Sequence, residues 1–323
     1  MEKNKKVLIL GAKGMLGQEL FRVYSEDAGY EVVGFDREEI DITDFVTAEK
    51  KIRSFAPEII LNAVAYNAVD RCEESDEEYA KAMLLNREVP KFLAKLAKDL
   101  DAVLVHYSSD YVFDGELEKS KEETGCCGGG CCGAGSSELG YDEESIPNPL
   151  SRYGESKLAG EIAVQAAHGK YHLIRLSKLF GKPAASEAGK RSFFEIMLEK
   201  GRENGEESVV DDEKSCFTYA PDAARATKAL LEENAPFGIY HLVSSGVATW
   251  YEAAVKLFQM AGMNVAVKPV NKEAFPRKAT RPKCSTLLNT KRPPLRNYEE
   301  ALSEFIRDMK KDSGAMASKG SKF

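Results

Sequence analysis

Residues 6–17 read KVLILGAKGMLG, a short apolar run that leads at once into three glycines and then into a helical pattern. Glycine permits a tight turn and a close approach of backbone to ligand, and the first N–H groups of a helix attract an anion. A strand, a glycine turn and a helix in this order are typical of a site for the pyrophosphate of NADPH or NADH. The spacing is GxxGxxG in place of GxGxxG, and an ordinary turn is the alternative interpretation. The residues expected to form this site are Gly11, Gly14, Met15, Leu16 and Gly17.

The rest of the first half alternates apolar runs with amphipathic stretches, which is the pattern of βαβ units in a doubly wound parallel sheet. The expected strands are Lys6 to Leu10, Glu31 to Phe35, Ile59 to Asn62, Val103 to Tyr107 and Tyr171 to Arg175. The expected helices are Met15 to Ser25, Asp44 to Phe55, Glu77 to Lys98 and Leu150 to Val164. Together they predict an NAD(P)-binding α/β domain of the Rossmann type over residues 1–176.

The pattern is less regular after residue 176, and we expect residues 177–311 to form mainly a smaller α/β substrate lobe, part of which returns to the first sheet. Its expected elements are helices at Ser192 to Gly201, Trp250 to Ala261 and Tyr298 to Met309, and a strand at Ile239 to Val243. Residues 116–146 far exceed the usual connection of about 2 to 6 residues, which indicates a long loop or insertion. The Gly, Ser and Lys content of residues 312–323 predicts a disordered tail.

The composition is that of a globular protein, with 323 residues of which 43% are hydrophobic. A formal net charge of -7 at pH 7 argues against a nucleic-acid binder and favours a small-molecule partner. No apolar run approaches the roughly 20 residues of a membrane-spanning helix, and no targeting segment is recognised at the start. We therefore expect a cytoplasmic protein that does not enter a membrane.

The second expected strand ends at Phe35-Asp36-Arg37, about twenty residues beyond the last glycine. An acid at this point binds ribose hydroxyls, and a neighbouring arginine can accommodate the 2′-phosphate of NADP. Asp36 and Arg37 supply both groups, so the choice between NAD and NADP stays open, and a solvated strand end is the alternative. Asp41 and Ile42 follow at a position where such folds often contact adenine.

Residues 148–157 read NPLSRYGESK and place Tyr153 and Lys157 four residues apart at the start of an expected helix. Residues at this spacing share one helical face, so the ammonium can lie near the phenol. A phenol with its usual pKa of about 10 is a poor acid at neutral pH, and we expect the ammonium to lower that pKa. The pair could then exchange a proton with an alcohol or ketone. An ordinary amphipathic helix is the alternative.

A second candidate group follows the strand at Val103 to Tyr107, where residues 108–115 read SSDYVFDG. At the carboxyl end of a parallel strand, the hydroxyl of Ser109 can hydrogen-bond a substrate oxygen beside a nicotinamide. A serine that caps a turn is the alternative interpretation. The glycine turn, Ser109 and the tyrosine–lysine pair occur in the order that favours the catalytic interpretation.

Motifs in both halves of the sequence resemble the dTDP-4-dehydrorhamnose reductase family of extended short-chain dehydrogenases/reductases. They are GAKGMLGQEL, DREEIDITD, LNAVAYNAVDRCEE, SSDYVFDG and NPLSRYGESKLAGE, followed by FTYAPDAARA, GIYHLVSSGVATWYEAA and TRPKCSTLLNTK. The resemblance implies NAD(P)H-dependent reduction of the 4-keto group of a dTDP-6-deoxy-4-keto-hexose, dTDP-4-dehydro-L-rhamnose, in polysaccharide biosynthesis. It also implies a dTDP-sugar partner and allows a homodimer.

The family's functional residues carry over position by position. Ser109, Tyr153 and Lys157 match the catalytic hydroxyl, tyrosine and lysine, with serine where threonine is common. The matched cofactor contacts are Ala63, Ala65, Tyr66 and Ser108, together with Tyr153 and Lys157. The matched positions facing the sugar are Val69, Asp110, Tyr111 and Lys178. Arg281 is expected to pair with the nucleotide diphosphate, because a guanidinium binds phosphate oxygens bidentately; a surface arginine is the alternative.

The sequence also departs from the family. Lys178 stands where many members carry a tryptophan that packs on the substrate, so the sugar or base preference stays open, and Cys216-Phe217 replace small turn residues.

Glu19 matches a glutamate that helps hold Mg²⁺ at a dimer contact in some members, but a single exposed helix carboxylate is normally solvated, so no metal is predicted. Residues 126–132, CCGGGCC, match no zinc spacing; an inert loop is favoured over a soft-metal or label site.

Two other functions share these motifs. An epimerase or dehydratase for another nucleotide sugar would use the same cofactor residues without net oxidation of the nicotinamide. A non-catalytic regulatory subunit similar to the β subunit of methionine adenosyltransferase would keep both the fold and the tyrosine–lysine pair. Stoichiometric consumption of NAD(P)H with a keto-sugar separates the reductase from both.

Overall fold

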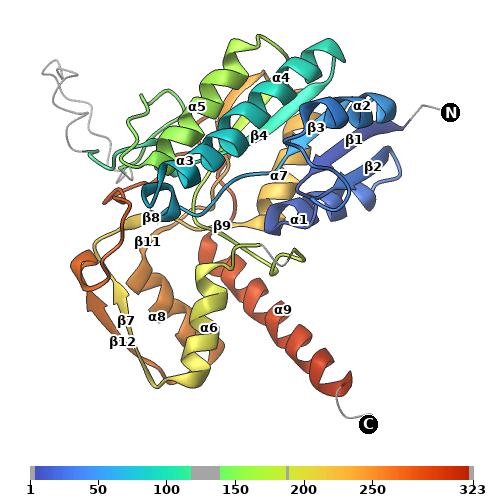
Figure 1. Ribbon diagram of the computed structural model, residues 1–323. Coiled ribbons are helices and arrows are strands. Elements are labelled where there is room, and N and C mark those ends of the chain that lie inside the picture. Colours follow the sequence, from blue (N-terminus) through green and yellow to red (C-terminus); the bar gives the residue numbers. More distant parts are fainter. Residues whose placement is uncertain (1–3, 118–138, 187–188, 320–323) are drawn as a thin grey trace, which may run out of the picture.

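The computed structural model describes residues 4–117, 139–186 and 189–319. Its centre is a six-stranded sheet in the order β10-β5-β4-β3-β1-β2, in which every pairing is parallel. Figure 1 labels β1, β2, β3 and β4 of this sheet, with helices packed around them. The strands are β1 Lys5–Leu10, β2 Tyr30–Phe35, β3 Ile59–Asn62, β4 Val103–Ser109, β5 Tyr171–Leu176 and β10 Gly238–His241. The predicted doubly wound α/β fold is confirmed.

Helices cover both faces of this sheet because successive side chains of a strand point to opposite sides. The helices of this domain are α1 Met15–Ser25, α2 Phe45–Phe55, α3 Asp76–Met83, α4 Val89–Asp99, α5 Arg152–Ala166 and α7 Ala220–Glu232. On β1, Val7 and Ile9 pack in the apolar cluster of α1 and α7, whereas Leu8 and Leu10 pack in the cluster of α2 and α4. A strand buried on both faces is therefore apolar throughout, as the opening run predicted.

The single helix predicted from Glu77 to Lys98 is divided by a π-helical segment at Leu84–Glu88. Pro90 has no N–H to donate to the carbonyl of residue 86, so the regular ladder of α-helical hydrogen bonds cannot continue there. Asn86 lies in this segment with its side chain buried, and its amide donates to the hydroxyl of Ser156 at 2.9 Å. The π-helical segment is thus hydrogen-bonded to α5, the helix that carries the predicted catalytic pair.

The chain leaves the sheet after β5, builds part of a second lobe, and returns through α7 and β10, which pairs with β5. The lobe contains β6 Leu179–Phe180, α6 Phe193–Glu203, β7 Glu206–Val210, β8 Lys214–Cys216, β9 Thr218–Tyr219, β11 Val247–Thr249, α8 Trp250–Ala261, β12 Ala266–Val270 and α9 Tyr298–Lys319. In Cys216-Phe217, the departure noted in the sequence, Cys216 ends β8 and Phe217 lies between β8 and β9, where its ring packs on Phe194 and Trp250. A buried aromatic therefore takes the place of the expected small turn residues.

Several features at the edges of the described residues bear on the predictions. Residues 312–319 are not a disordered tail but extend α9 to Lys319, because Met, Ala and Lys are good helix formers and outweigh a single glycine. The predicted insertion at 116–146 is described only at its two ends, and the cysteines at 126–132 lie outside the described residues.

Within the described residues, no helix combines the length and the apolar character needed to cross a membrane.

Candidate active site

The site begins where the order of the strands reverses. β1 lies between β2 and β3, so the connections after β1 and β3 diverge and open a crevice at the carboxyl ends of the strands. Gly11 has a left-handed φ of +76°, and a Cβ there would lie 3.1 Å from the carbonyl carbon of Ala63. A Cβ at Gly17 would lie 2.0 Å from the carbonyl oxygen of Gly11. Only glycine fits both positions.

The helix that follows this turn offers its N-terminus to a ligand. Gly14 is the N-cap of α1, and among the residues described no side chain caps this end. Met15 and Leu16 occupy the first turn, where backbone N–H groups lack an intrahelical acceptor. An uncapped helix N-terminus beside a turn that excludes side chains fits the pyrophosphate of a dinucleotide. The structure thus brings the five predicted pyrophosphate residues together.

The end of β2 carries the predicted ribose-binding acid. Asp36 accepts hydrogen bonds from the backbone N–H groups of Lys13 at 3.0 Å and Arg37 at 2.8 Å, which ties it to the glycine turn. The side chain of Arg37 is exposed. Asp41 accepts two hydrogen bonds within its own turn, and Ile42 is buried in the core. Asp36 and Arg37 therefore lie beside the pyrophosphate turn, whereas the carboxylate of Asp41 is bound by the N–H and the hydroxyl of Thr43.

The loop after β3 and the end of β4 hold the remaining predicted cofactor contacts. Ala63 and Ala65 follow β3 directly, and the N–H of Tyr66 is held by the side-chain oxygen of Asn86 at 2.8 Å. Ser108 is buried near the end of β4, and its hydroxyl has no hydrogen-bond partner within the described ranges. These segments leave the same carboxyl edge of the sheet as the glycine turn.

Helix α5 carries Tyr153 and Lys157 at its start. Ser151 initiates the helix by accepting a first-turn N–H at 3.2 Å. Lys157 is 2% exposed, and its ammonium donates to the carbonyl oxygen of Tyr107 on β4 at 2.7 Å. The hydroxyl of Tyr153 donates to the side-chain oxygen of Asn67, in the loop after β3, at 3.4 Å. Both side chains thus point toward the carboxyl edge of the sheet.

Burial sets the pKa values of this pair. It lowers the pKa of the Lys157 ammonium to about 8, against the opposing effect of the Glu161 carboxylate. Burial also raises the pKa of the Tyr153 phenol, and a hydrogen bond with Ser109 offsets only part of this rise. The expected lowering of the tyrosine pKa by the ammonium is therefore corrected: desolvation of the phenol is the larger effect. A phenol that keeps its proton is suited to donate it.

Ser109, the predicted catalytic hydroxyl, is the last residue of β4. Its hydroxyl donates to Asp110 Oδ1 at 2.9 Å and accepts the backbone N–H of Tyr111 at 3.2 Å. Asp110 begins a short 3₁₀ turn, Asp110–Val112, and is only 1% exposed. The carboxylate of Asp110 is buried among serine hydroxyls at the junction of the two lobes, and its expected contact with the sugar stays a prediction.

Three further predicted substrate positions lie near this junction. Val69 is buried in one apolar cluster with Tyr153, and the ring of Tyr111 meets that of Tyr153 edge to face at 5.6 Å. Lys178 has a left-handed φ of 36°, and its ammonium lies 4.3 Å from the centre of the Trp250 ring of the second lobe. The lysine that replaces the family's tryptophan therefore rests on another tryptophan.

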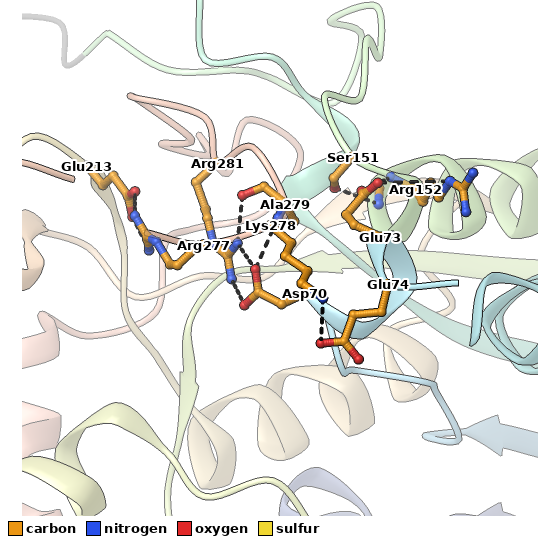
Figure 2. A network of polar contacts seen from close by, with 11 residues as sticks. Asp70, Glu73, Glu74, Ser151, Arg152, Glu213, Arg277, Lys278, Ala279 and Arg281 are labelled. Atoms are coloured by element: carbon orange, nitrogen blue, oxygen red, sulfur yellow. Dashed lines mark hydrogen bonds and ion pairs between the residues drawn. The ribbon is translucent and has the colours of Figure 1, made fainter. Parts of the chain in front are cut away.

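Arg281 lies in residues 277–288, here called the crossing segment, which reaches from the second lobe to the loop after β3 (Figure 2). Its guanidinium donates to both oxygens of Asp70, each at 2.6 Å. A second ion pair joins Lys278 to Glu74 at 3.5 Å. The guanidinium predicted to bind a diphosphate is therefore engaged by a carboxylate, with which a phosphate would compete.

Sequence reasoning missed some residues of the site and misjudged another. Asn67 and Asp70 lie inside the motif LNAVAYNAVDRCEE, but nothing in the sequence shows which side chain meets Tyr153 or Arg281. Glu19, expected to be exposed, is 7% exposed and pairs with a neighbouring arginine of α1 at 2.9 Å. In the part of the chain that is described, no three metal-ligating side chains gather in one place.

Comparison with known proteins agrees with this geometry. The family model described as RmlD substrate binding domain matches residues 5–311. The chain is 33% identical over 296 residues to dTDP-4-dehydrorhamnose reductase of Escherichia coli, a match that covers 87% of this chain and 88% of that protein. It is 31% identical over 309 residues to the spore coat polysaccharide biosynthesis protein SpsK of Bacillus subtilis, covering 94% and 97%.

Solved structures show the same likeness. The dTDP-4-dehydrorhamnose reductase of Bacillus anthracis in complex with NADP superposes with a TM-score of 0.81 at 31% identity, covering 95% of this chain and 100% of that one. A UDP-glucose 4-epimerase of Thermus thermophilus, at 19% identity and a TM-score of 0.71, shares the fold alone. Sequence and structure agree across both lobes, and the chain belongs to the dTDP-4-dehydrorhamnose reductase family, whose model carries the description RmlD substrate binding domain.

Proposed function

We propose that the protein is an NAD(P)H-dependent reductase of a dTDP-linked 4-keto sugar, and that this sugar is dTDP-4-dehydro-L-rhamnose, which becomes dTDP-L-rhamnose. One observation carries the proposal: a glycine turn with an uncapped helix N-terminus shares one sheet edge with a buried phenol and ammonium. The proposal is supported by relatives named dTDP-4-dehydrorhamnose reductase and by the NADP in the structure of one of them.

The fit of a dinucleotide rests on the turn after β1. The glycine turn would hold its pyrophosphate, and Asp36 and Arg37 would lie at the adenosine ribose. When bound, the nicotinamide supplies the hydride that reduces the ketone carbon. The residues of this chain then have to orient the ketone and supply one proton.

Tyr153 is the proton donor in this proposal. Because burial raises its pKa, the phenol is protonated at neutral pH and can give its proton to the ketone oxygen as that oxygen becomes negative. Lys157, with a pKa of about 8, is mostly an ammonium at pH 7, and its positive charge stabilises the phenolate that forms. Ser109 places a hydroxyl beside the same phenol. Acid catalysis of this kind contributes about 10² to 10⁴-fold.

The direct test uses the keto-sugar made enzymatically in situ from dTDP-glucose. We expect the purified protein to consume NADPH or NADH in proportion to the sugar and to consume neither with UDP-hexoses. Comparing the two nucleotides also measures the cofactor preference. A protein that binds NADPH tightly yet reduces no keto-sugar would contradict the reductase and favour a regulatory subunit.

Tyr153→Phe tests the proton donor. The change removes one hydroxyl, so we expect kcat to fall at least about 100-fold while NADPH affinity stays the same. Tyr24→Phe is the matched control, because Tyr24 is fully buried in the core and its hydroxyl has no partner among the described residues. That variant should keep its turnover. Near-normal turnover of Tyr153→Phe would refute the assignment.

A further inference from the structure

Asp110 is a buried carboxylate that receives serine hydroxyls from several separate segments. Its Oδ1 accepts a hydrogen bond from Ser109 at 2.9 Å, and its Oδ2 accepts hydrogen bonds from Ser285 at 2.6 Å, Ser177 at 2.8 Å and Ser215 at 3.2 Å. Ser177 follows β5, Ser215 lies in β8 of the second lobe, and Ser285 belongs to the crossing segment. One side chain therefore joins the predicted catalytic strand to three other parts of the molecule.

Asp110 and its serine partners lie in the interior of the protein, so their hydrogen bonds are not chance surface contacts. Asp110 is 1% exposed, and the three distant serines are between 0% and 2% exposed. A carboxylate that loses its solvation on burial needs hydrogen-bond donors in return. Within the described ranges, every donor to the carboxylate of Asp110 is a serine hydroxyl.

These contacts decide which hydrogen bond the Ser109 hydroxyl donates and which it accepts. A serine hydroxyl has one hydrogen, and the strongest acceptor within reach of Ser109 is the charged oxygen of Asp110. The same hydroxyl oxygen also accepts the N–H of Tyr111 at 3.2 Å. These two bonds hold the Ser109 oxygen at the end of β4, and Tyr111, which donates one of them, packs its ring edge to face on that of Tyr153 at 5.6 Å.

We propose that Asp110 is a positioning residue, which fixes the hydroxyl of Ser109 against Tyr153 and couples that position to the docking of the second lobe. This inference rests on the proposed function, because it gives Asp110 its role through the hydroxyl of the same reaction. It differs from a sugar contact, because serine hydroxyls already occupy both oxygens of the carboxylate. The two roles affect kcat and KM differently.

A double-mutant cycle separates the two roles. In Asp110→Asn the shape is kept and the charge is lost, so we expect kcat for the keto-sugar to fall about tenfold or more with KM within about twofold. In a Ser109→Ala background the same substitution should lower kcat less than about twofold, because Asp110 acts through the hydroxyl already removed. Equal losses in both backgrounds, or a raised KM at unchanged kcat, would overturn the proposal.

Ser285→Ala is a milder second variant, because it removes one hydroxyl on the far side of Asp110. It should lower kcat about two- to fivefold, again only when Ser109 is present. Ser244→Ala is the matched control: Ser244 is as deeply buried as Ser285, each at 1% exposed, and its hydroxyl has no hydrogen-bond partner among the described residues. That variant should leave kcat unchanged, and a loss as large as that of Ser285→Ala would count against the proposal.

A measurement without substrate keeps the inference separate from the proposed function. Ser109→Ala and Ser285→Ala are made singly and together, and their urea unfolding is compared. The two hydroxyls bond opposite oxygens of Asp110, so their effects on stability should be non-additive. Additive effects would overturn the coupling. Absence of wild-type turnover on every keto-sugar would instead count against the proposed function alone.

Discussion

Glu161→Gln should destabilise the protein strongly, because it leaves a buried guanidinium without its counter-ion. Glu161 lies on α5 one turn beyond Lys157, and it accepts two hydrogen bonds from Arg175 on β5, at 2.7 and 3.0 Å. Glu161 is 0% exposed and Arg175 is 1% exposed. The ring of Phe113 lies 5.0 Å from the guanidinium and adds no acceptor.

The magnitude follows from this burial. Removing one partner of a buried ion pair costs about 3 to 5 kcal/mol, mainly because the other charge stays buried and unpaired. Gln keeps the shape and one acceptor oxygen, so we expect a loss near the lower end, about 3 kcal/mol, in the free energy of unfolding at pH 7. Urea unfolding followed by circular dichroism measures it. Glu26→Gln is the control, since its pair with Arg22 at 3.0 Å is largely exposed and such pairs contribute under about 1 kcal/mol.

A second variant separates the cost of an unpaired charge from the value of the pair. Replacing Glu161 by Leu and Arg175 by Met removes both charges, and such apolar replacements of a buried pair are often neutral or stabilising. The double variant should therefore be more stable than Glu161→Gln. A loss below about 1 kcal/mol in Glu161→Gln, or a double variant that is less stable than it, would refute the reasoning.

Three other predictions follow from the same structure. Gly17→Ala should weaken NADPH binding at least about tenfold, because its Cβ would lie 2.0 Å from a carbonyl oxygen of the turn. Gly205→Ala is the control, because a Cβ there would have no atom within 4 Å. Fluorescence titration measures the NADPH affinity of both variants, and unchanged affinity in Gly17→Ala would contradict the prediction. Glu161→Gln should move the alkaline limb of the kcat–pH profile to lower pH, because the carboxylate raises the pKa of Lys157 against burial, which lowers it to about 8; an unmoved limb would contradict this. Burial lowers the pKa of His172 to about 4, so the unfolded protein binds more protons between pH 6.5 and 4 and stability falls as pH falls through this window. Substituting His172 by Gln should reduce that fall by roughly 3 kcal/mol in urea unfolding compared at the two pH values, and an identical fall in both proteins would exclude the histidine as its source.

The elements that could be predicted from sequence are those whose signal is local. The strands of the first half are apolar runs bounded by turns, and the tyrosine–lysine spacing places two side chains on one face of a helix. Helix α7 was missed although Pro221 and a run of alanines give a local start signal. The short strands β6 and β9 have two residues each and show no periodicity.

The parts of the site that could not be predicted depend on contacts between distant residues. Arg281 was assigned to a phosphate from its chemistry, but its partner Asp70 lies 211 residues away in sequence. Asp110 was placed against the sugar by its motif, yet its environment is set by serines as far away as Ser285, 175 residues along the chain. The raised pKa of Tyr153 likewise depends on burial, which the spacing of the motif does not reveal.

The return of the chain to the central sheet also bears on biosynthesis at the ribosome. Until residues 238–241 have emerged from the ribosome, β5 is an edge strand with unpaired backbone groups. The residues predicted to bind the cofactor, all of which precede β5, have already been made by then. The nascent chain must therefore carry an unfinished sheet while much of the second lobe is synthesised. The segments of the two lobes alternate along the chain, so neither lobe corresponds to one contiguous stretch of the polypeptide.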